Sequence, residues 1–231
     1  TVDRKLAVTA TDLAIWLMRR VVNYVRVVFS SVSYAMWLLC RDIRRKPLPE
    51  LVAILRKKLA DDDVTFSGYA VKGRTGIDGL GLNQFSRRYI YHLLARLTEA
   101  TEIGAGRTET FDRLVDRTLK NPFDIEHIWA DDYEIVKDQF STEQEFQDWR
   151  NHVASLLLLP ADVNRSLQDK PFPLKRVHYA KQNFFAASLD SSVYEHQPQF
   201  QQFSTKYELS FKFAEVFDKA EQQVRRKLIA G

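Results

Sequence analysis

Two carboxylates and an imidazole lie within four residues in the segment Asp124-Ile125-Glu126-His127-Ile128. A carboxylate is an oxygen ligand of the kind that a hard divalent cation prefers. Because the ordinary pKa of a histidine is ~6.5, His127 can take a proton at neutral pH and is the natural general base. A Glu-His pair alone is more often structural, so the interpretation depends on what accompanies it.

A second group of polar residues follows the apolar run 156–159. Asn164 offers an amide oxygen, so Glu126 and Asn164 are candidate ligands for one Mg²⁺ or Mn²⁺ ion. The basic residues that follow are candidates for contacts with DNA phosphates: Arg165, Lys170, Lys175 and Lys181. The two segments together predict a small nuclease site, in which the metal stabilises the negative charge that develops during phosphodiester hydrolysis.

This site makes a geometric demand on its strand. Glu126 and His127 are neighbours, and neighbours in a regular strand point to opposite faces. Both side chains can serve one site only if the strand ends or bends there. The polar pair Asp131-Asp132 soon after makes such an end plausible.

The charges of the chain support a cation site beside a polyanion site. The net charge is only +4, but residues 124–148 carry nine Asp/Glu and one Lys, whereas residues 164–181 carry five Lys/Arg and one Asp. Residues 1–46 are also basic, with nine Lys/Arg and three Asp. An acidic block followed by a basic block suits a metal next to nucleic acid. Taken singly, each block is equally explained by a solvated helix face.

Composition indicates a soluble globular protein, with 45% hydrophobic and 28% charged residues among 231. The single cysteine, Cys40, excludes an internal disulfide framework and a cysteine-based zinc site, and we expect it to be buried in a reducing cytoplasm. The longest uncharged run, Val27–Cys40, is too short to cross a bilayer, and no signal peptide is visible. Since the chain starts at Thr1, we expect a piece of a longer protein.

Hydrophobic spacing predicts a mainly helical chain with two short strands. Residues Tyr34, Trp37 and Leu38 are expected in the core. The spacing of Ser141 and Gln144 predicts a capping box. The expected strands are 123–128 and 155–159. The expected helices are 3–45 with a break at Ser30-Ser31, 51–59, 84–98, 108–119, 141–152, 161–187 bent or broken around Pro171 and Pro173, and 211–229.

The glycine-rich segment 61–84 is expected to be a loop. Its run Gly73-Arg74-Thr75-Gly76 lacks the Gly-Lys-Ser/Thr ending of a phosphate loop and follows no apolar strand. Shortly after it, Arg87-Arg88 could contact phosphate or could simply be solvated.

Three motifs resemble a known family. They are Asp-Ile-Glu-His-Ile at 124–128, Leu-Leu-Leu-Leu-Pro-Ala-Asp-Val-Asn at 156–164, and Lys-Pro-Phe-Pro-Leu-Lys at 170–175 followed by Tyr179. They resemble the HNH (ββα-metal) nuclease domain at the C-terminus of GmrSD-type restriction endonucleases, prokaryotic anti-phage proteins that include nickases linked to DNA phosphorothioation. The motif-bearing part covers roughly residues 108–190.

The resemblance implies a role for each motif residue. His127 would activate water, and Glu126 and Asn164 would hold the divalent metal. Asp124 would be a further acid near the site and a candidate ligand through water, and Lys170 and Lys175 would face the substrate. The family also has an N-terminal nucleotide-hydrolysing sensor domain, of which this chain shows no sign, so we expect the C-terminal portion of a larger protein.

The chain departs from the family pattern at three places. Ala130 stands where proline is usual, Ala154-Ser155 where Gly-Asn is usual, and Glu126 where other HNH enzymes carry Asp. The first two are expected to affect the shape of the loop and hairpin more than the chemistry.

These expectations amount to a helical bundle with an embedded ββα-metal (HNH) nuclease motif. The expected parts are a helical scaffold over 1–106, the nuclease core over 107–190 and a C-terminal helix packing on the core over 191–231. The predicted function is a metal-dependent endonuclease that nicks or cleaves DNA in restriction. Two alternatives stay open: a non-catalytic DNA- or protein-binding helical module on a decayed nuclease fold, and an RNA-directed toxin nuclease with the same site.

Overall fold

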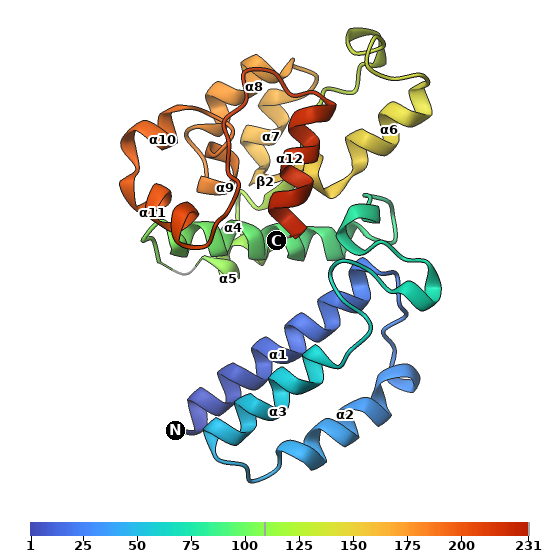
Figure 1. The fold of residues 1–231 in the computed structure, drawn as a ribbon. Helices are drawn as coiled ribbons and strands as arrows, with labels where there is room; N and C mark the ends of the chain where they lie inside the picture. Colours follow the sequence, from blue (N-terminus) through green and yellow to red (C-terminus); the bar gives the residue numbers. More distant parts are fainter. Residues whose placement is uncertain (109, 231) are drawn as a thin grey trace. The chain divides into compact units, whose positions relative to one another are not determined.

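The computed structural model describes residues 1–108 and 110–230. Over these residues it is mostly helical, with a two-stranded antiparallel sheet. The expected mainly helical fold with a small β element is therefore confirmed. The chain divides into two compact units, Thr1–Leu80 and Gly81–Gly231, which are described separately (Figure 1).

The first unit is built from three helices and two short 3-10 helices. Its core is a leucine cluster of Leu39, Leu51 and Leu55, and each such side chain contributes about 1.5–3 kcal/mol when it leaves water. The elements are α1 (Val2–Val22), α2 (Phe29–Ile43), α3 (Leu48–Ala60), η1 (Ala70–Lys72) and η2 (Gly76–Gly79).

The break in the first helical segment lies earlier than expected. Asn23 ends α1, because its Nδ2 donates to the carbonyl oxygens of both Arg19 and Thr65 at 2.7 Å. Ser31 does not break the helix but lies in the first turn of α2, where its Oγ accepts a hydrogen bond from the Val28 amide at 3.1 Å. Serine is well suited to this role at a helix start.

The expectation that Tyr34 and Trp37 lie in the core is wrong. They are 71% and 56% exposed, and the buried face of α2 carries Leu39 instead. Cys40 was also expected inside and is exposed. The reason is the phase of the helix: the apolar residues of α2 cover more than one face, and only the Leu39 face meets α1 and α3.

The second unit carries every predicted site residue. Its elements are α4 (Arg87–Gly104), α5 (Phe111–Val115), β1 (Phe123–His127), η3 (Tyr133–Ile135), α6 (Glu143–Asn151), η4 (Val153–Ser155), β2 (Leu156–Pro160), α7 (Ala161–Leu167), α8 (Phe172–Tyr179), α9 (Phe184–Ala187), α10 (Ser192–His196), α11 (Pro198–Lys206) and α12 (Lys219–Ala230).

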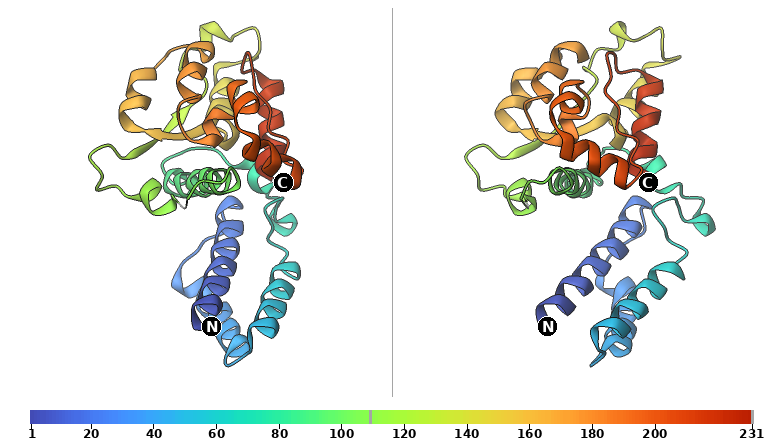
Figure 2. Two further views of the ribbon diagram at one scale, coloured as in Figure 1. Left: turned by 90° about the vertical axis from the view of Figure 1, so that its left-hand side faces the viewer. Right: turned by 60° about the vertical axis from the view of Figure 1, so that its left-hand side comes forward.

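The strand pair lies at the centre of this unit. Strands β1 and β2 are antiparallel, with Phe123 opposite Pro160 and His127 opposite Leu156. Leucines 156–159 are all buried, because α4 packs on one side of the pair and α7 on the other (Figures 1 and 2). A continuous apolar run is what a strand covered on both faces requires. Both strands agree with the expected ranges to within one residue.

The helices before β2 differ from expectation at their ends. Helix α4 starts at Arg87 because Ser86 first closes a turn with Asn83, and it continues to Gly104. Helix α5 is shorter than the expected 108–119, a range that includes residue 109 outside the described part. In α6 the capping pair is Thr142 and Glu145, one residue later than predicted.

The expected helix 161–187 is broken rather than bent, and the expected helix 211–229 begins only at Lys219. The first divides into α7, α8 and α9, and α7 ends at Gln168, whose φ of 39° is left-handed. In the second, tertiary hydrogen bonds hold residues 211–218 out of helical geometry: Arg176 donates to the Ala214 carbonyl oxygen, and the Trp129 ring nitrogen donates to that of Phe217.

The border between the two units lies at residues 80 and 81, whereas the expected scaffold region extends to residue 106. The difference is α4, which packs against α5, α9 and β2 and so belongs to the second unit. The division into scaffold, nuclease core and C-terminal helix stays a prediction. Among the described residues, no helix is long and apolar enough to span a membrane.

Candidate active site

The carboxylate of Glu126 is buried inside the second unit. Glu126 is 3% exposed, and α8 supplies both of its partners. The Tyr179 hydroxyl donates to Oε1 at 2.8 Å, and Lys175 Nζ lies 2.9 Å from the same oxygen. In the described part of the chain, Oε2 receives no hydrogen bond, so one oxygen of this carboxylate is available to a further cation.

Lys175 contacts both Glu126 and His127. Its Nζ also donates to the backbone carbonyl oxygen of His127 at 2.8 Å, and the residue is only 1% exposed. Lys175 and Tyr179 are four residues apart, so they share one face of α8. The expected contact between Lys175 and substrate is therefore not supported, because an ammonium held inside this pair has no surface to offer a phosphate.

The protonation of this cluster follows from its burial. Burial raises the pKa of the Glu126 carboxyl above its ordinary value, and the opposing effects of Lys175 and Tyr179 are smaller. Burial and the neighbouring Glu126 charge also raise the pKa of Tyr179 well above its ordinary value, so this hydroxyl stays protonated and donates.

The imidazole of His127 is neutral at pH 7, with a pKa below the ordinary value on which its prediction as the general base was based. Burial, followed by the charge of Arg150, lowers its pKa from 6.5 to about 4, so the ring is neutral at pH 7. Its Nε2 lies 3.0 Å from Asn151 Oδ1. Because Asn151 Nδ2 donates to Gln147, its Oδ1 accepts from His127 Nε2, which leaves the lone pair on Nδ1.

Strand β1 ends at His127, the position at which we expected the strand to end or bend so that Glu126 and His127 could serve one site. The pairing with β2 is regular up to that point. Glu126 then meets α8, whereas His127 meets Asn151 at the end of α6. The positive charge of Arg150 acts on both side chains. It adds to the effect of burial in lowering the pKa of His127, and it offsets part of the rise that burial causes in the pKa of Glu126.

Asn164 lies against the backbone of β1. It sits on α7, which follows β2 directly, and its Nδ2 donates to the Ile125 carbonyl oxygen at 3.0 Å. This bond places the Asn164 amide beside the peptide unit that joins Ile125 to Glu126. Its Oδ1 has no hydrogen-bond partner among the described residues. The structure thus places Asn164 against β1, the strand that carries Glu126, and each side chain keeps one oxygen without a hydrogen bond among the described residues. Their joint role as metal ligands stays a prediction.

Asp124 is placed apart from this cluster. Its carboxylate forms an ion pair with Arg117 at 3.2 Å and lines a cavity of about 420 Å³ that also contains Arg87 and Arg88. No contact in the described structure joins Asp124 to Glu126, so its role as a metal ligand stays a prediction without support.

The remaining predicted DNA contacts are on the surface. Arg165, Lys170 and Lys181 are exposed. Lys170 Nζ donates to the Ser166 carbonyl oxygen within the same turn, and Lys181 lines a separate small cavity. These three side chains can reach a solvent-borne polyanion, but the structure does not test whether they do.

Two residues near the site were not predicted from the sequence. Arg150 has a side chain only 13% exposed and lies 3.7 Å from Asp131, and Asn151 orients His127. Both belong to α6, and they are 24 residues from β1 in sequence. By contrast, the i to i+4 spacing of Lys175 and Tyr179 could have indicated a shared face toward the core.

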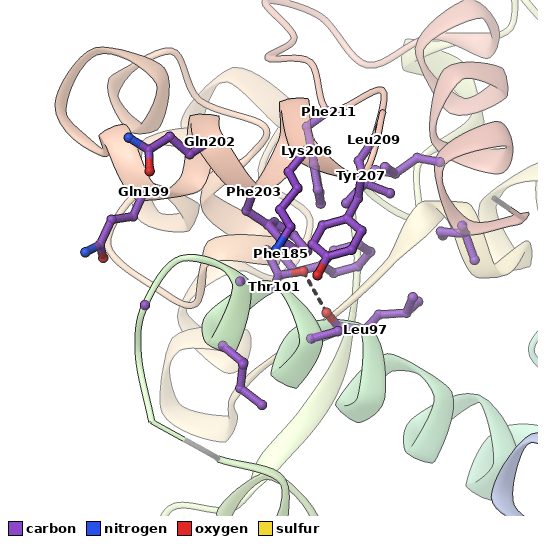
Figure 3. Close-up of a pocket in the computed structure, with 16 residues that line it drawn as sticks. Leu97, Thr101, Phe185, Gln199, Gln202, Phe203, Lys206, Tyr207, Leu209 and Phe211 are labelled. Atoms are coloured by element: carbon purple, nitrogen blue, oxygen red, sulfur yellow. Dashed lines mark hydrogen bonds between the residues drawn. The ribbon is translucent and has the colours of Figure 1, made fainter. Parts of the chain in front are cut away.

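Clusters elsewhere do not provide a better site. Over the described residues, no group of three or more His, Cys, Asp or Glu side chains could hold a metal ion. A cavity of about 760 Å³ lies between α4, α11 and α12 and is lined mainly by apolar side chains such as Phe185, Phe203 and Phe211 (Figure 3). None of the predicted site residues lines it.

Comparison with known proteins gives one match. A family model described as GmrSD restriction endonucleases, C-terminal domain, matches residues 80–207, which is more than half of the chain. Neither the curated proteins nor the solved structures contain a significant match. The matched range begins at the border between the two units and contains β1, β2, α7 and α8.

Proposed function

Because this chain belongs to the family of GmrSD restriction endonuclease C-terminal domains, which indicates a nuclease role in restriction, we propose that its second unit is a metal-dependent HNH endonuclease acting on DNA. One observation carries this proposal. Two unpaired oxygens, Glu126 Oε2 and Asn164 Oδ1, lie on adjacent elements beside a histidine that is neutral at pH 7.

The order of elements supports the HNH assignment. Two antiparallel strands, β1 and β2, are followed at once by helix α7, which packs on both. This is a strand, strand and helix arrangement of the ββα type. The candidate base and one candidate ligand come from β1, and the other ligand comes from α7.

The residues present fit a hard divalent cation, Mg²⁺ or Mn²⁺. Such ions prefer carboxylate and amide oxygens and keep several water ligands, so two protein oxygens suffice. Glu126 and Asn164 would hold the ion. When bound, it would supply electrostatic stabilisation of the charge that develops on the phosphate and the leaving oxygen.

The chain's own residues would carry the proton chemistry. His127 Nδ1 accepts the proton of the attacking water, while Asn151 fixes the tautomer through Nε2. Arg150 contributes a positive charge close to both Glu126 and His127, where it can attract the scissile phosphate. Lys175 and Tyr179 act as positioning residues, because they hold Oε1 of Glu126 and leave Oε2 available.

Ala154 and Ser155, which differ from the family pattern, pack against elements other than the candidate metal ligands. Ser155 Oγ donates to the Trp149 carbonyl oxygen and accepts from Gln222, and Arg225 donates to the Ala154 carbonyl oxygen. Both residues are buried. Their side chains contact neither Glu126 nor His127, which favours the catalytic proposal over a decayed site.

A plasmid-nicking assay tests the proposal. Supercoiled DNA is incubated with the protein and Mg²⁺, Mn²⁺ or EDTA, and His127→Ala is compared with wild type. Loss of a general base should reduce the rate by ~10²–10⁴-fold. Lys137→Ala is the control, since Lys137 is exposed and pairs only with Glu134.

The outcomes separate the alternatives. Metal-dependent nicking that is lost in His127→Ala supports the nuclease. A wild-type protein without nicking in any metal favours the non-catalytic DNA- or protein-binding module. Faster cleavage of RNA than of DNA favours the RNA-directed nuclease.

A further inference from the structure

Two buried threonines of α4 differ in the hydrogen bonding of their hydroxyl groups. Thr101 is 3% exposed, and its hydroxyl donates to the Leu97 carbonyl oxygen one turn back at 2.7 Å (Figure 3). Thr98 is 0% exposed, and its hydroxyl has no hydrogen-bond partner among the residues that the structure describes. A helix offers both threonines the same backbone acceptor, so the unpaired Thr98 hydroxyl requires another explanation.

Thr98 lines a small cavity that is rich in positive charge. The cavity has a volume of about 210 Å³ and lies where α4, the α5 region and the segment after α8 meet. Thr110, whose hydroxyl is also buried and unpaired, lines it as well. Three basic side chains are also part of the lining, and we call this cavity the basic pocket: Arg107, Arg113 and Lys181.

The one carboxylate of the basic pocket is already satisfied. Glu102 is buried, and its two oxygens are taken by Arg107 at 3.1 Å and by the Phe184 amide at 2.6 Å. Arg113 and Lys181 form no ion pair with any described residue. Among the described residues, the charges of Arg113 and Lys181 are therefore uncompensated and two hydroxyls are unpaired, and such a combination is the recognition chemistry of an oxyanion.

The size of the basic pocket restricts its ligand. Sites for drug-sized molecules measure about 300–1,000 Å³, so a volume of about 210 Å³ is too small for a whole nucleotide. A phosphate group fits, and it accepts hydrogen bonds from guanidinium, ammonium and hydroxyl donors at once.

We propose that the basic pocket binds a phosphate group, and that this phosphate belongs to the backbone of the DNA substrate. Phe123 and Pro160 line the pocket and face each other at one end of the strand pair, whereas His127 lies at the other end. Four strand residues separate the ends by roughly 13 Å, at about 3.3 Å per residue. That is a few nucleotides from the candidate cleavage position. The assignment to DNA rests on the proposed nuclease function, whereas the phosphate chemistry does not.

Matched variants test the pocket in the full chain. Thr98→Val removes the hydroxyl and keeps the shape, and Thr101→Val is its control in the same helix. Arg113→Gln removes a charge from the pocket, and Lys227→Gln removes an exposed charge from α12. The readout is the affinity for a short fluorescent DNA duplex in EDTA, measured over a range of salt concentrations.

We expect Thr98→Val to weaken DNA binding on the order of tenfold, because it loses a hydrogen bond to a charged group. Arg113→Gln should also weaken binding and reduce the slope of log affinity against log salt by about 1. Thr101→Val and Lys227→Gln should match wild type.

A second arm identifies the source of the phosphate. Thermal unfolding is followed in sodium phosphate and in sodium chloride of equal ionic strength, for wild type, Thr98→Val, Arg113→Gln and the two control variants. A phosphate-specific rise in Tm that Thr98→Val abolishes, with DNA affinity unchanged, assigns the pocket to free phosphate and overturns the DNA assignment. If Thr98→Val and Arg113→Gln match their controls in both arms, the pocket proposal is wrong. Neither arm uses cleavage, so a wild-type protein that fails to nick DNA refutes the nuclease function and leaves these readings intact.

Discussion

Lys175 is the residue on which the candidate site most depends. Its ammonium is 1% exposed and contacts both the Glu126 carboxylate and the His127 carbonyl oxygen. A buried ion pair gains little overall, since desolvation offsets the attraction, but removing one partner leaves an uncompensated buried charge. The pair is therefore a constraint on geometry more than a source of stability.

Substitution of Lys175 by Met should destabilise the protein strongly. The change keeps the volume of the side chain and leaves Glu126 buried without a counter-charge, which costs ~3–5 kcal/mol. Urea unfolding in EDTA measures it. Lys170→Met is the control, because Lys170 is exposed, and surface changes usually stay within about 0.5 kcal/mol. If the two variants are equally stable, the buried pair does not hold the site.

At the scale of elements, α1 contains a carboxyl that opposes folding at neutral pH. Asp12 is 7% exposed, and its Oδ1 has no hydrogen-bond partner. Burial raises its pKa above 3.8, and the charges of Arg19 and Lys58 only partly offset this effect. The native state therefore binds the proton more tightly than the unfolded state. This stability is fully present below the ordinary pKa and is lost as pH rises from there through the higher pKa of the folded state.

Asp12→Asn should accordingly raise the free energy of unfolding at pH 7. The gain should shrink as pH falls below about 4, where the carboxyl of the unfolded chain is also protonated. Denaturant unfolding at pH 7 and pH 3 measures the difference. Asp3→Asn in the first turn of the same helix should show no such gain, because an exposed acid there favours the helix. A loss of stability at pH 7 in Asp12→Asn would contradict this account.

The elements also show what the sequence could and could not predict. The strands were predicted to within a residue, because apolar residues and flanking prolines mark short buried strands locally. The region 211–218 was predicted as helix and is not, since Trp129 and Arg176 bind its backbone from distant elements. Motif spacing predicted that Asn164 and Glu126 serve one site, and the structure places Asn164 against the backbone of the strand that carries Glu126.

Arg150 and Asn151 could not be found in the same way. They reach the site only because the end of α6 lies beside β1. This contact joins residues that are distant in sequence, so no local sequence pattern predicts it. Lys175 was predicted at the site but with the opposite orientation. Its type suggested phosphate, whereas its burial beside Glu126 depends on the packing of α8, which spacing alone does not reveal.

At the scale of the whole molecule, each unit has its own hydrophobic core. Leu39, Leu51 and Leu55 form one core in Thr1–Leu80, whereas the second unit is centred on β1 and β2 and carries a further cluster around Phe184 and Phe200. A segment with its own core can in principle fold alone. We therefore expect the fragment 81–231 to fold without the first unit and to retain the nuclease activity proposed above.

Truncation to residues 81–231 and Leu51→Ala in the full chain test this expectation together. The fragment should unfold cooperatively by circular dichroism and nick plasmid at a rate within a few-fold of the full chain. Leu51 is 3% exposed, so Leu51→Ala should cost about 2–5 kcal/mol, confined to the unfolding of the first unit. Nicking should be unaffected, because Glu126, His127 and Asn164 all belong to the second unit. If Leu51→Ala abolishes nicking while the protein stays folded, the first unit takes part in the reaction, and the site defined here is incomplete.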